Sequence, residues 1–187
     1  MENNIEVSNI STRSSNKIIN ILVVIDTDSV INDFKGKYVS KDYTKPTSIS
    51  HNYSYMVTTS AHSISGSGTA DLNIKANVGD VIRWTGISES GNFDSSVLIY
   101  GVPKFKGDNV FVDPTFKSFS KRSMTPKQGG PFPVTFRDQI NWFLQADIHQ
   151  TGKEHYNIQF GVYYRPTGGE QELFGYFYWD PTITVRN

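Results

Sequence analysis

The stretch from Lys17 to Asp28, KIINILVVIDTD, constrains the fold more than any other part of the chain. Seven of the eight residues from Ile18 to Ile25 are large aliphatics, and four of those seven are isoleucine. The run is too short for a membrane span, which needs about 20 residues, and it lacks the spacing of an amphipathic helix. Because β-branched side chains favour a pleated surface, we predict a central strand that is covered on both faces.

Acidic residues follow this strand directly, at Asp26 and Asp28. Two carboxylates at a strand end are typical either of a binding site or of a helix cap. Together with Asp180, which follows a later strand, they have the oxygen ligands that a Ca²⁺ ion takes. We therefore consider Asp26, Asp28, Trp179 and Asp180 a candidate binding rim, with capping and turn geometry as the simpler interpretation.

The composition favours an all-β protein and narrows the classes of partner. Aromatic residues make up 13% of the 187 residues and charged residues 19%, with a formal net charge of zero. A neutral chain lacks the basic excess that binding to nucleic acid or to an anionic membrane requires, and its weak self-repulsion favours association. The absence of cysteine excludes disulfides and thiol chemistry.

The beginning of the chain, Met1-Glu2-Asn3-Asn4, is acidic and polar, and no cleavage site follows the first apolar run. We therefore expect a cytoplasmic protein without a membrane span. Residues 1–16 carry little periodicity and are predicted to form a flexible N-terminal arm. Residues 17–187 are predicted to form one β-sandwich domain.

Alternating apolar and polar residues dominate the rest of the chain. Such runs, separated by turn signals every eight to twelve residues and without a long amphipathic helix, are typical of a β-sandwich. We predict a single-domain antiparallel β-sandwich of the jelly-roll or Ig-like kind, with nine or ten strands and little helix. The runs at 70–76 and 81–87 are expected to pair as a β-hairpin.

Two further hairpins are predicted in the last third of the chain. Pairing of 140–148 with 156–164 places His149 opposite His155, with Asp147 adjacent. Two imidazoles and a carboxylate can hold a divalent metal, and the alternative is an exposed polar pair near a turn.

The second of these hairpins has its loop at 166–171. Its register places Ile158 opposite Trp179, Phe160 opposite Phe177 and Arg165 opposite Glu172.

Residues 103–133 contain five prolines and are predicted to be the longest irregular stretch. Lysines and arginines alternate there with phenylalanines, a pattern also found in nucleic-acid-binding segments. Nothing elsewhere adds to this positive charge, so we interpret the stretch as a solvated loop pinned by aromatics and expect no nucleic-acid partner.

Aromatic residues also occupy both faces of the predicted strand at 172–179. Phe174, Tyr176 and Tyr178 lie on one face, and Phe177 and Trp179 lie on the other. One face needs a cover besides the core, which the 103–133 loop, another subunit or a stacked sugar can supply. The chain has no motif of an activated nucleophile, and we predict no enzymatic activity and no cofactor.

Four blocks of sequence resemble the bacterial inclusion-body protein family, the AidA/PixA-like proteins. They are NILVVIDTDSVI from Asn20, YMVTT from Tyr55, GDVIRW from Gly79 and GYFYWDPTITV from Gly175. The resemblance implies an abundant intracellular protein under quorum-sensing or stationary-phase control, deposited as inclusion bodies in some members and linked to host interaction in others. It supplies no catalytic residues.

These observations lead to two hypotheses. The first is a non-catalytic, self-associating protein, at least a homodimer, that is capable of dense assembly. The second is a carbohydrate-binding module that stacks a glycan on its aromatic residues.

Overall fold

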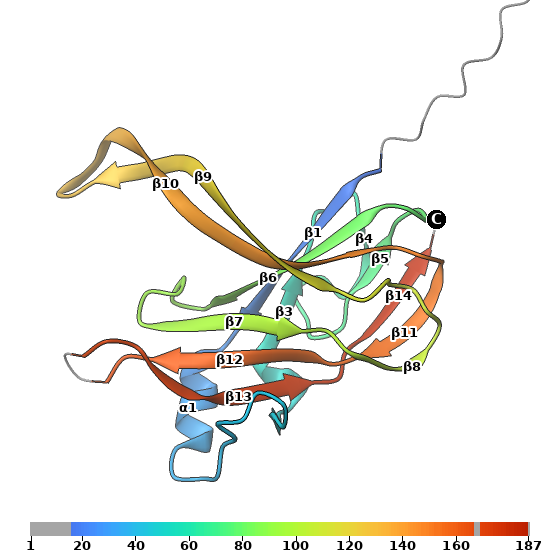
Figure 1. The fold of residues 1–187 in the computed structure, drawn as a ribbon, viewed down its shortest axis with the longest axis horizontal. Helices are drawn as coiled ribbons and strands as arrows, with labels where there is room; N and C mark the ends of the chain where they lie inside the picture. Colours follow the sequence, from blue (N-terminus) through green and yellow to red (C-terminus); the bar gives the residue numbers. More distant parts are fainter. Residues whose placement is uncertain (1–15, 167–168, 187) are drawn as a thin grey trace, which may run out of the picture.

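A computed structural model describes residues 16–166 and 169–186 of the chain (Figure 1). The predicted N-terminal arm, residues 1–16, lies outside the described residues except for Asn16. The described residues form fourteen strands and little helix, so the β-rich prediction is confirmed and the count of nine or ten strands is too low. None of the helices in these residues is long and apolar enough to cross a membrane.

In chain order the elements are β1 (Ile18–Ile25), α1 (Thr27–Phe34), β2 (Thr47–Ser48), the 3-10 helix η1 (His51–Tyr53), β3 (Ser54–Val57), β4 (Ser63–Ser65), β5 (Asn73–Lys75), β6 (Val81–Ser88), β7 (Ser95–Gly101), β8 (Lys104–Gly107), β9 (Thr115–Lys127), β10 (Gly130–Asp147), β11 (Gly152–Tyr156), β12 (Ile158–Tyr164), β13 (Glu172–Trp179) and β14 (Thr182–Arg186).

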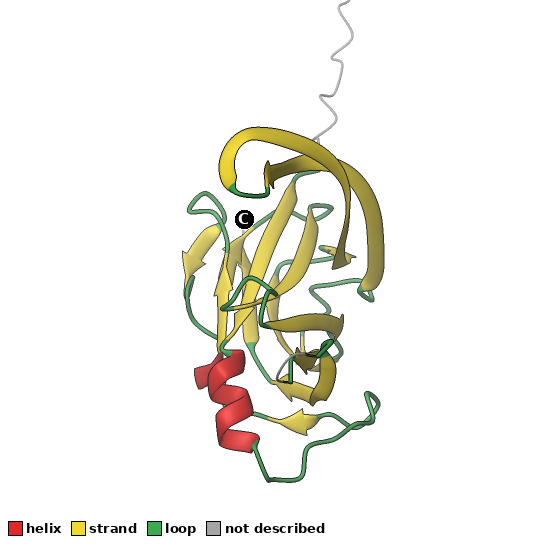
Figure 2. Cartoon of the chain, turned by 90° about the vertical axis from the view of Figure 1, so that its left-hand side faces the viewer, coloured by secondary structure: helices red, strands yellow, loops and turns green. Residues whose placement is uncertain are grey.

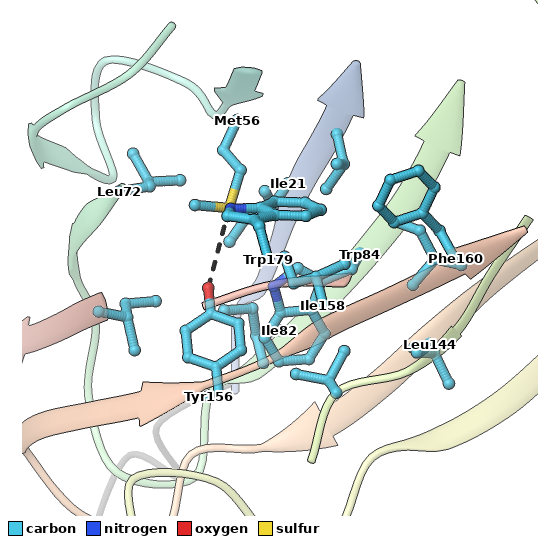
Figure 3. Close-up of a cluster of buried hydrophobic side chains, with 14 of the residues drawn as sticks. Ile21, Met56, Leu72, Ile82, Trp84, Leu144, Tyr156, Ile158, Phe160 and Trp179 are labelled. Atoms are coloured by element: carbon cyan, nitrogen blue, oxygen red, sulfur yellow. Dashed lines mark hydrogen bonds between the residues drawn. The ribbon is translucent and has the colours of Figure 1, made fainter. Parts of the chain in front are cut away.

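Three sheets surround one hydrophobic core in a sandwich-like arrangement. The first has the order β3-β1-β6-β10-β9, the second β2-β13-β12-β7 and the third β4-β5-β14-β11-β8. Most neighbouring strands are antiparallel, as predicted, but β1 with β6, β13 with β2 and β14 with β5 are parallel. All three sheets contribute to the core, where Trp84, Tyr156, Phe160 and Trp179 are each fully buried (Figure 3).

Strand β1 is an interior strand, paired with β3 on one side and with β6 on the other. Its two faces differ, which corrects the prediction that both are covered. Ile19, Ile21, Val23 and Ile25 are buried, whereas Ile18 is 47% exposed and Leu22 is 39% exposed. The reason is that only one side of the first sheet faces the core, so alternate residues of an apolar run point outward.

Two of the three predicted hairpins do not form, because their strands pair with other strands. Strand β6 pairs with β1 and β10, and β5 pairs with β4 and β14, so residues 70–76 and 81–87 are not neighbours in a sheet. Strand β10 pairs with β6 and β9, whereas β12 pairs with β13 and β7. The chain passes from the first sheet through β11 of the third sheet before it enters the second, and alternation alone does not reveal such a crossing.

The third predicted hairpin, β12 with β13, is largely confirmed. Ile158 pairs with Trp179, and Phe160 pairs with Phe177. A register shift between Val162 and Tyr163 changes the pairs near the turn, where Tyr164 rather than Arg165 faces Glu172.

Candidate functional site

The acidic end of β1 forms a helix cap. The Asp26 carboxylate accepts hydrogen bonds from the Ser29 backbone N–H at 2.9 Å and from the Ser29 hydroxyl at 2.8 Å, at the start of α1. Asp28 lies in the exposed first turn, where a negative charge complements the helix dipole. Between them Thr27 is fully buried and bonds to the carboxylate of Glu89 and to Ser95. These contacts agree with the capping interpretation.

The other two residues of the predicted rim have different surroundings. Trp179 is fully buried and its indole N–H donates to the Ala70 carbonyl at 3.2 Å, so its ring is not available at a surface rim. Asp180 is exposed and lies 3.3 Å from Nε2 of His51, whose Nδ1 lies 3.2 Å from Asp71. Asp180 therefore belongs to a polar cluster with His51 and Asp71 rather than to the helix cap.

The predicted metal triad depends on a strand pairing that does not exist. Asp147 ends β10 beside Val81, and the His149 backbone N–H donates to the Val110 carbonyl. His155 lies in β11, paired with Lys106 and Thr182. Within residues 16–166 and 169–186, no group of three or more His, Asp or Glu side chains could hold a metal ion.

A long hairpin is the most unusual feature of the molecule. Strands β9 and β10 pair continuously from Gln145 opposite Thr115 to Thr135 opposite Thr125, and only the last residues of β10, from Leu144, pair with β6. We call residues 115–143 the projecting hairpin. It rises from the body at the end opposite α1 (Figure 1), and Figure 2 shows that it curves over at its tip. The predicted loop at 103–133 is therefore wrong over most of its second half.

One face of the projecting hairpin continues the inner face of the first sheet. Leu144 and Ala146 of β10 belong to the core, and five apolar side chains on the same face of the hairpin are between 37% and 65% exposed. We call this set the apolar stripe: Phe116, Met124, Phe136, Ile140 and Trp142. The same face also carries the polar and charged residues Ser118, Ser120, Arg122 and Asp138.

The opposite face of the projecting hairpin is mainly polar, with lysine, arginine, glutamine and asparagine side chains. At its base the Phe119 and Phe143 rings stack at a centroid distance of 5.9 Å. The Arg83 guanidinium lies 4.4 Å from the Phe143 ring centroid and donates to the Gln145 side chain at 2.8 Å. These contacts fix the base of the hairpin to β6, so the apolar stripe is presented in a defined orientation.

The aromatic residues of β13 lie on the predicted faces with one exception. The sequence predicts Phe174 on the face of Tyr176, but its ring stacks on Phe177 at 6.1 Å between centroids and packs against the core, because the strand register shifts beside it. Phe177 and Trp179 point into the core, whereas Tyr176 lies on the outer side, where Tyr43 and Tyr100 contact it edge to face at 6.3 and 5.5 Å between centroids. The cover over Tyr176 comes from the segment before β2, where the Tyr43 carbonyl also accepts a hydrogen bond from the Tyr100 hydroxyl at 2.8 Å. Beside Tyr178, Phe105 of the 103–133 stretch contributes as well.

A cleft of about 250 Å³ lies next to this aromatic face. Its lining combines two aromatic rings with carboxylate, amide and hydroxyl groups, from Ser48, Phe105, Asn157, Tyr178 and Asp180. Rings for stacking together with hydrogen-bonding side chains are the groups that a sugar requires. Asp180 is the one residue of the predicted rim that lines this cleft.

Glu154 is a buried carboxylate that the sequence did not single out. Only 2% of the residue is exposed, and its carboxylate accepts the Val110 backbone N–H at 2.7 Å. Burial raises the pKa of Glu154 above its ordinary value of 4.5, against the opposing effect of the hydrogen bonds from Val110 and Phe111.

The raised pKa of Glu154 predicts a pH-dependent stability. Above pH 4.5 the unfolded chain has released the proton that the folded protein still holds, so the free energy of unfolding falls as the pH rises through the folded pKa. We expect Glu154→Gln to remove this contribution to the pH dependence of the free energy of unfolding. Urea unfolding between about pH 4 and 8 measures it, with Glu172→Gln, at an exposed carboxylate, as the control. Equal slopes in Glu154→Gln and the wild type would contradict the prediction.

Comparison with known proteins finds a family model and a solved structure. The family model described as PixA, inclusion body protein, matches residues 17–185. The crystal structure of an inclusion body protein (PixA) from Burkholderia cenocepacia is 26% identical and covers 95% of this chain and 100% of its own, with a TM-score of 0.76. No curated protein matches.

Proposed function

Because the chain belongs to the PixA family of inclusion body proteins, we propose that it is a non-catalytic protein that self-associates into dense deposits in the cytoplasm. The observation that carries this proposal is the apolar stripe on the projecting hairpin. Soluble monomers rarely expose a contiguous apolar patch of more than a few hundred Å², and larger patches mark interaction sites. A formal net charge of zero removes the repulsion that would keep copies apart.

The association state tests this function. We expect sedimentation velocity and light scattering to show at least dimers at micromolar concentration, and larger species as the concentration rises. Turbidity should be greatest near the isoelectric point of 6.9, where the net charge vanishes. A protein that stays strictly monomeric and clear at high concentration would contradict the proposal.

Glycan binding is the second candidate function, and a role in host interaction would follow from it. The cleft beside Tyr178 and Asp180 favours it, because two aromatic rings and three polar side chains converge there. A glycan array is the test, with Tyr178→Ala expected to abolish any hits. Tyr38→Ala is the matched control, since Tyr38 is 89% exposed and does not line the cleft. An array without hits on the wild type would exclude this function for the glycans displayed.

A further inference from the structure

We infer that the apolar stripe is covered by the projecting hairpin of a second copy of this chain, in a two-fold dimer with reciprocal contacts. The inference rests on the proposed self-association and specifies its interface. In a two-fold interface the same surface of each copy meets its equivalent, so the surface must be complementary to itself.

The apolar stripe lies where the covering layer of the sandwich ends. Over the body, the inner face of the first sheet packs closely against the second sheet: a Cβ on Gly86 of β6 would lie 2.8 Å from the Ile99 side chain of β7. Strand β7 is the edge of the second sheet. The projecting hairpin leaves the body near this edge, and its inner-face residues are exposed although their neighbour Leu144 is buried.

The area of the stripe suits a dimer of this chain. Large apolar and aromatic side chains have about 150–250 Å² of surface each, and the five residues of the stripe are roughly half exposed. Each copy therefore offers on the order of 500 Å². Two copies together bury roughly 1,000 Å², which is about the lower limit for a specific interface.

The free edge of the hairpin argues for packing by faces rather than by strand addition. Strand β9 is the edge of the first sheet, and it carries Lys117, Lys121, Lys127 and Pro126. Lysines and proline on an edge strand oppose pairing with a further strand. An assembly that used this edge would have to cover these groups, whereas packing by the apolar face leaves them in solvent.

Two charged residues on the hairpin favour a second copy of this chain, rather than another protein, as the partner that covers the stripe. On the same face as the apolar stripe, Arg122 of β9 lies directly opposite Asp138 of β10. In residues 16–166 and 169–186 neither side chain forms a salt bridge, although the two are cross-strand neighbours. A charge covered by an apolar surface needs an opposite charge. In a two-fold dimer Arg122 of each copy is matched with Asp138 of the partner subunit.

Charge reversal tests the inference. We expect Arg122→Glu alone and Asp138→Lys alone each to weaken self-association at least tenfold in sedimentation velocity, because four like charges then meet at the centre of the dimer. A 1:1 mixture of the two variants should restore association to within about threefold of the wild type. Lys121→Glu, on the opposite face, is the control and should leave association unchanged. Arg122 and Asp138 are both exposed, and thermal melting checks that each variant folds.

The possible outcomes separate this inference from the proposed function. A wild type that associates while both single variants associate equally well would overturn the two-fold interface and leave self-association standing. Weakened single variants that do not recover on mixing would overturn the reciprocal charge pairing. A wild type that is monomeric at every concentration would overturn the proposed function, and the inference would fall with it.

Discussion

Replacement of Ile140 with aspartate is expected to weaken self-association about 100-fold, or roughly 2.7 kcal/mol, without unfolding the protein. Ile140 is 65% exposed on the projecting hairpin, so its substitution should change the free energy of unfolding by less than about 0.5 kcal/mol. In the proposed dimer the same position is covered by apolar side chains, and a carboxylate there would lose its hydration. Sedimentation velocity measures the association, and urea unfolding measures the stability.

The neighbouring residue Gln139 provides a matched control. It is also exposed, but it pairs with Lys121 on the opposite face of the hairpin. Gln139→Asp adds the same charge one position away and should leave association unchanged. Equal weakening by both substitutions would show that net charge is responsible rather than the apolar stripe, and unchanged association of Ile140→Asp would contradict a role for the stripe.

Local patterns in the sequence predict where strands lie and which residues share a face, but they do not predict which strands pair with each other. The alternation at 156–164 and 172–179 predicts the pairs Ile158–Trp179 and Phe160–Phe177 because a short loop joins these strands. The same reasoning fails for β10 and β12, since β11 lies between them in the chain and joins another sheet. Parallel pairing of β1 with β6 joins residues about 60 positions apart, and such contacts leave no signal in a short window.

The projecting hairpin was missed for a different reason. Pro126, Pro131 and Pro133 and the nearby lysines are typical of a loop, because proline lacks the N–H that a ladder requires. Pro126 lies in β9, however, which is an edge strand, and an edge tolerates proline and uses lysine to block further pairing. Pro131 and Pro133 lie in β10 where its pairing is interrupted, between Gly130 and Thr135. With β9 recognised as a strand, the apolar character of one face follows from the alternation of Ile140 and Trp142 with polar residues.

The candidate rim shows what strand-end residues can and cannot indicate. The capping alternative for Asp26 follows from its position before the helical turn, and the Ser29 contacts agree with it. The contact of Asp180 with His51 joins residues 129 positions apart, and no spacing rule predicts it. Parity along β13 places Phe177 and Trp179 on one face, but the sequence does not reveal whether that face is the core or the surface.

Trp179→Ala is expected to have the largest effect on stability, a loss of about 3–5 kcal/mol. The indole is fully buried and contacts the Phe160 ring edge to face at 5.7 Å. Its removal also leaves the Ala70 carbonyl without its 3.2 Å hydrogen bond, which adds the cost of an unsatisfied buried acceptor. Since a domain of this kind is stable by only about 5–15 kcal/mol, the midpoint of urea unfolding should fall sharply.

Trp142→Ala is the matched comparison, since it removes the same side chain from the apolar stripe. Trp142 is 37% exposed and lies beyond the covering layer, so its loss should cost much less in unfolding than the loss of Trp179. The reverse holds for association: Trp142→Ala should weaken the dimer, whereas a folded Trp179 variant should retain its affinity. Similar losses of stability in the two variants would mean that the projecting hairpin is part of the cooperative core. Opposite effects would show that the fold depends on one tryptophan and assembly on the other.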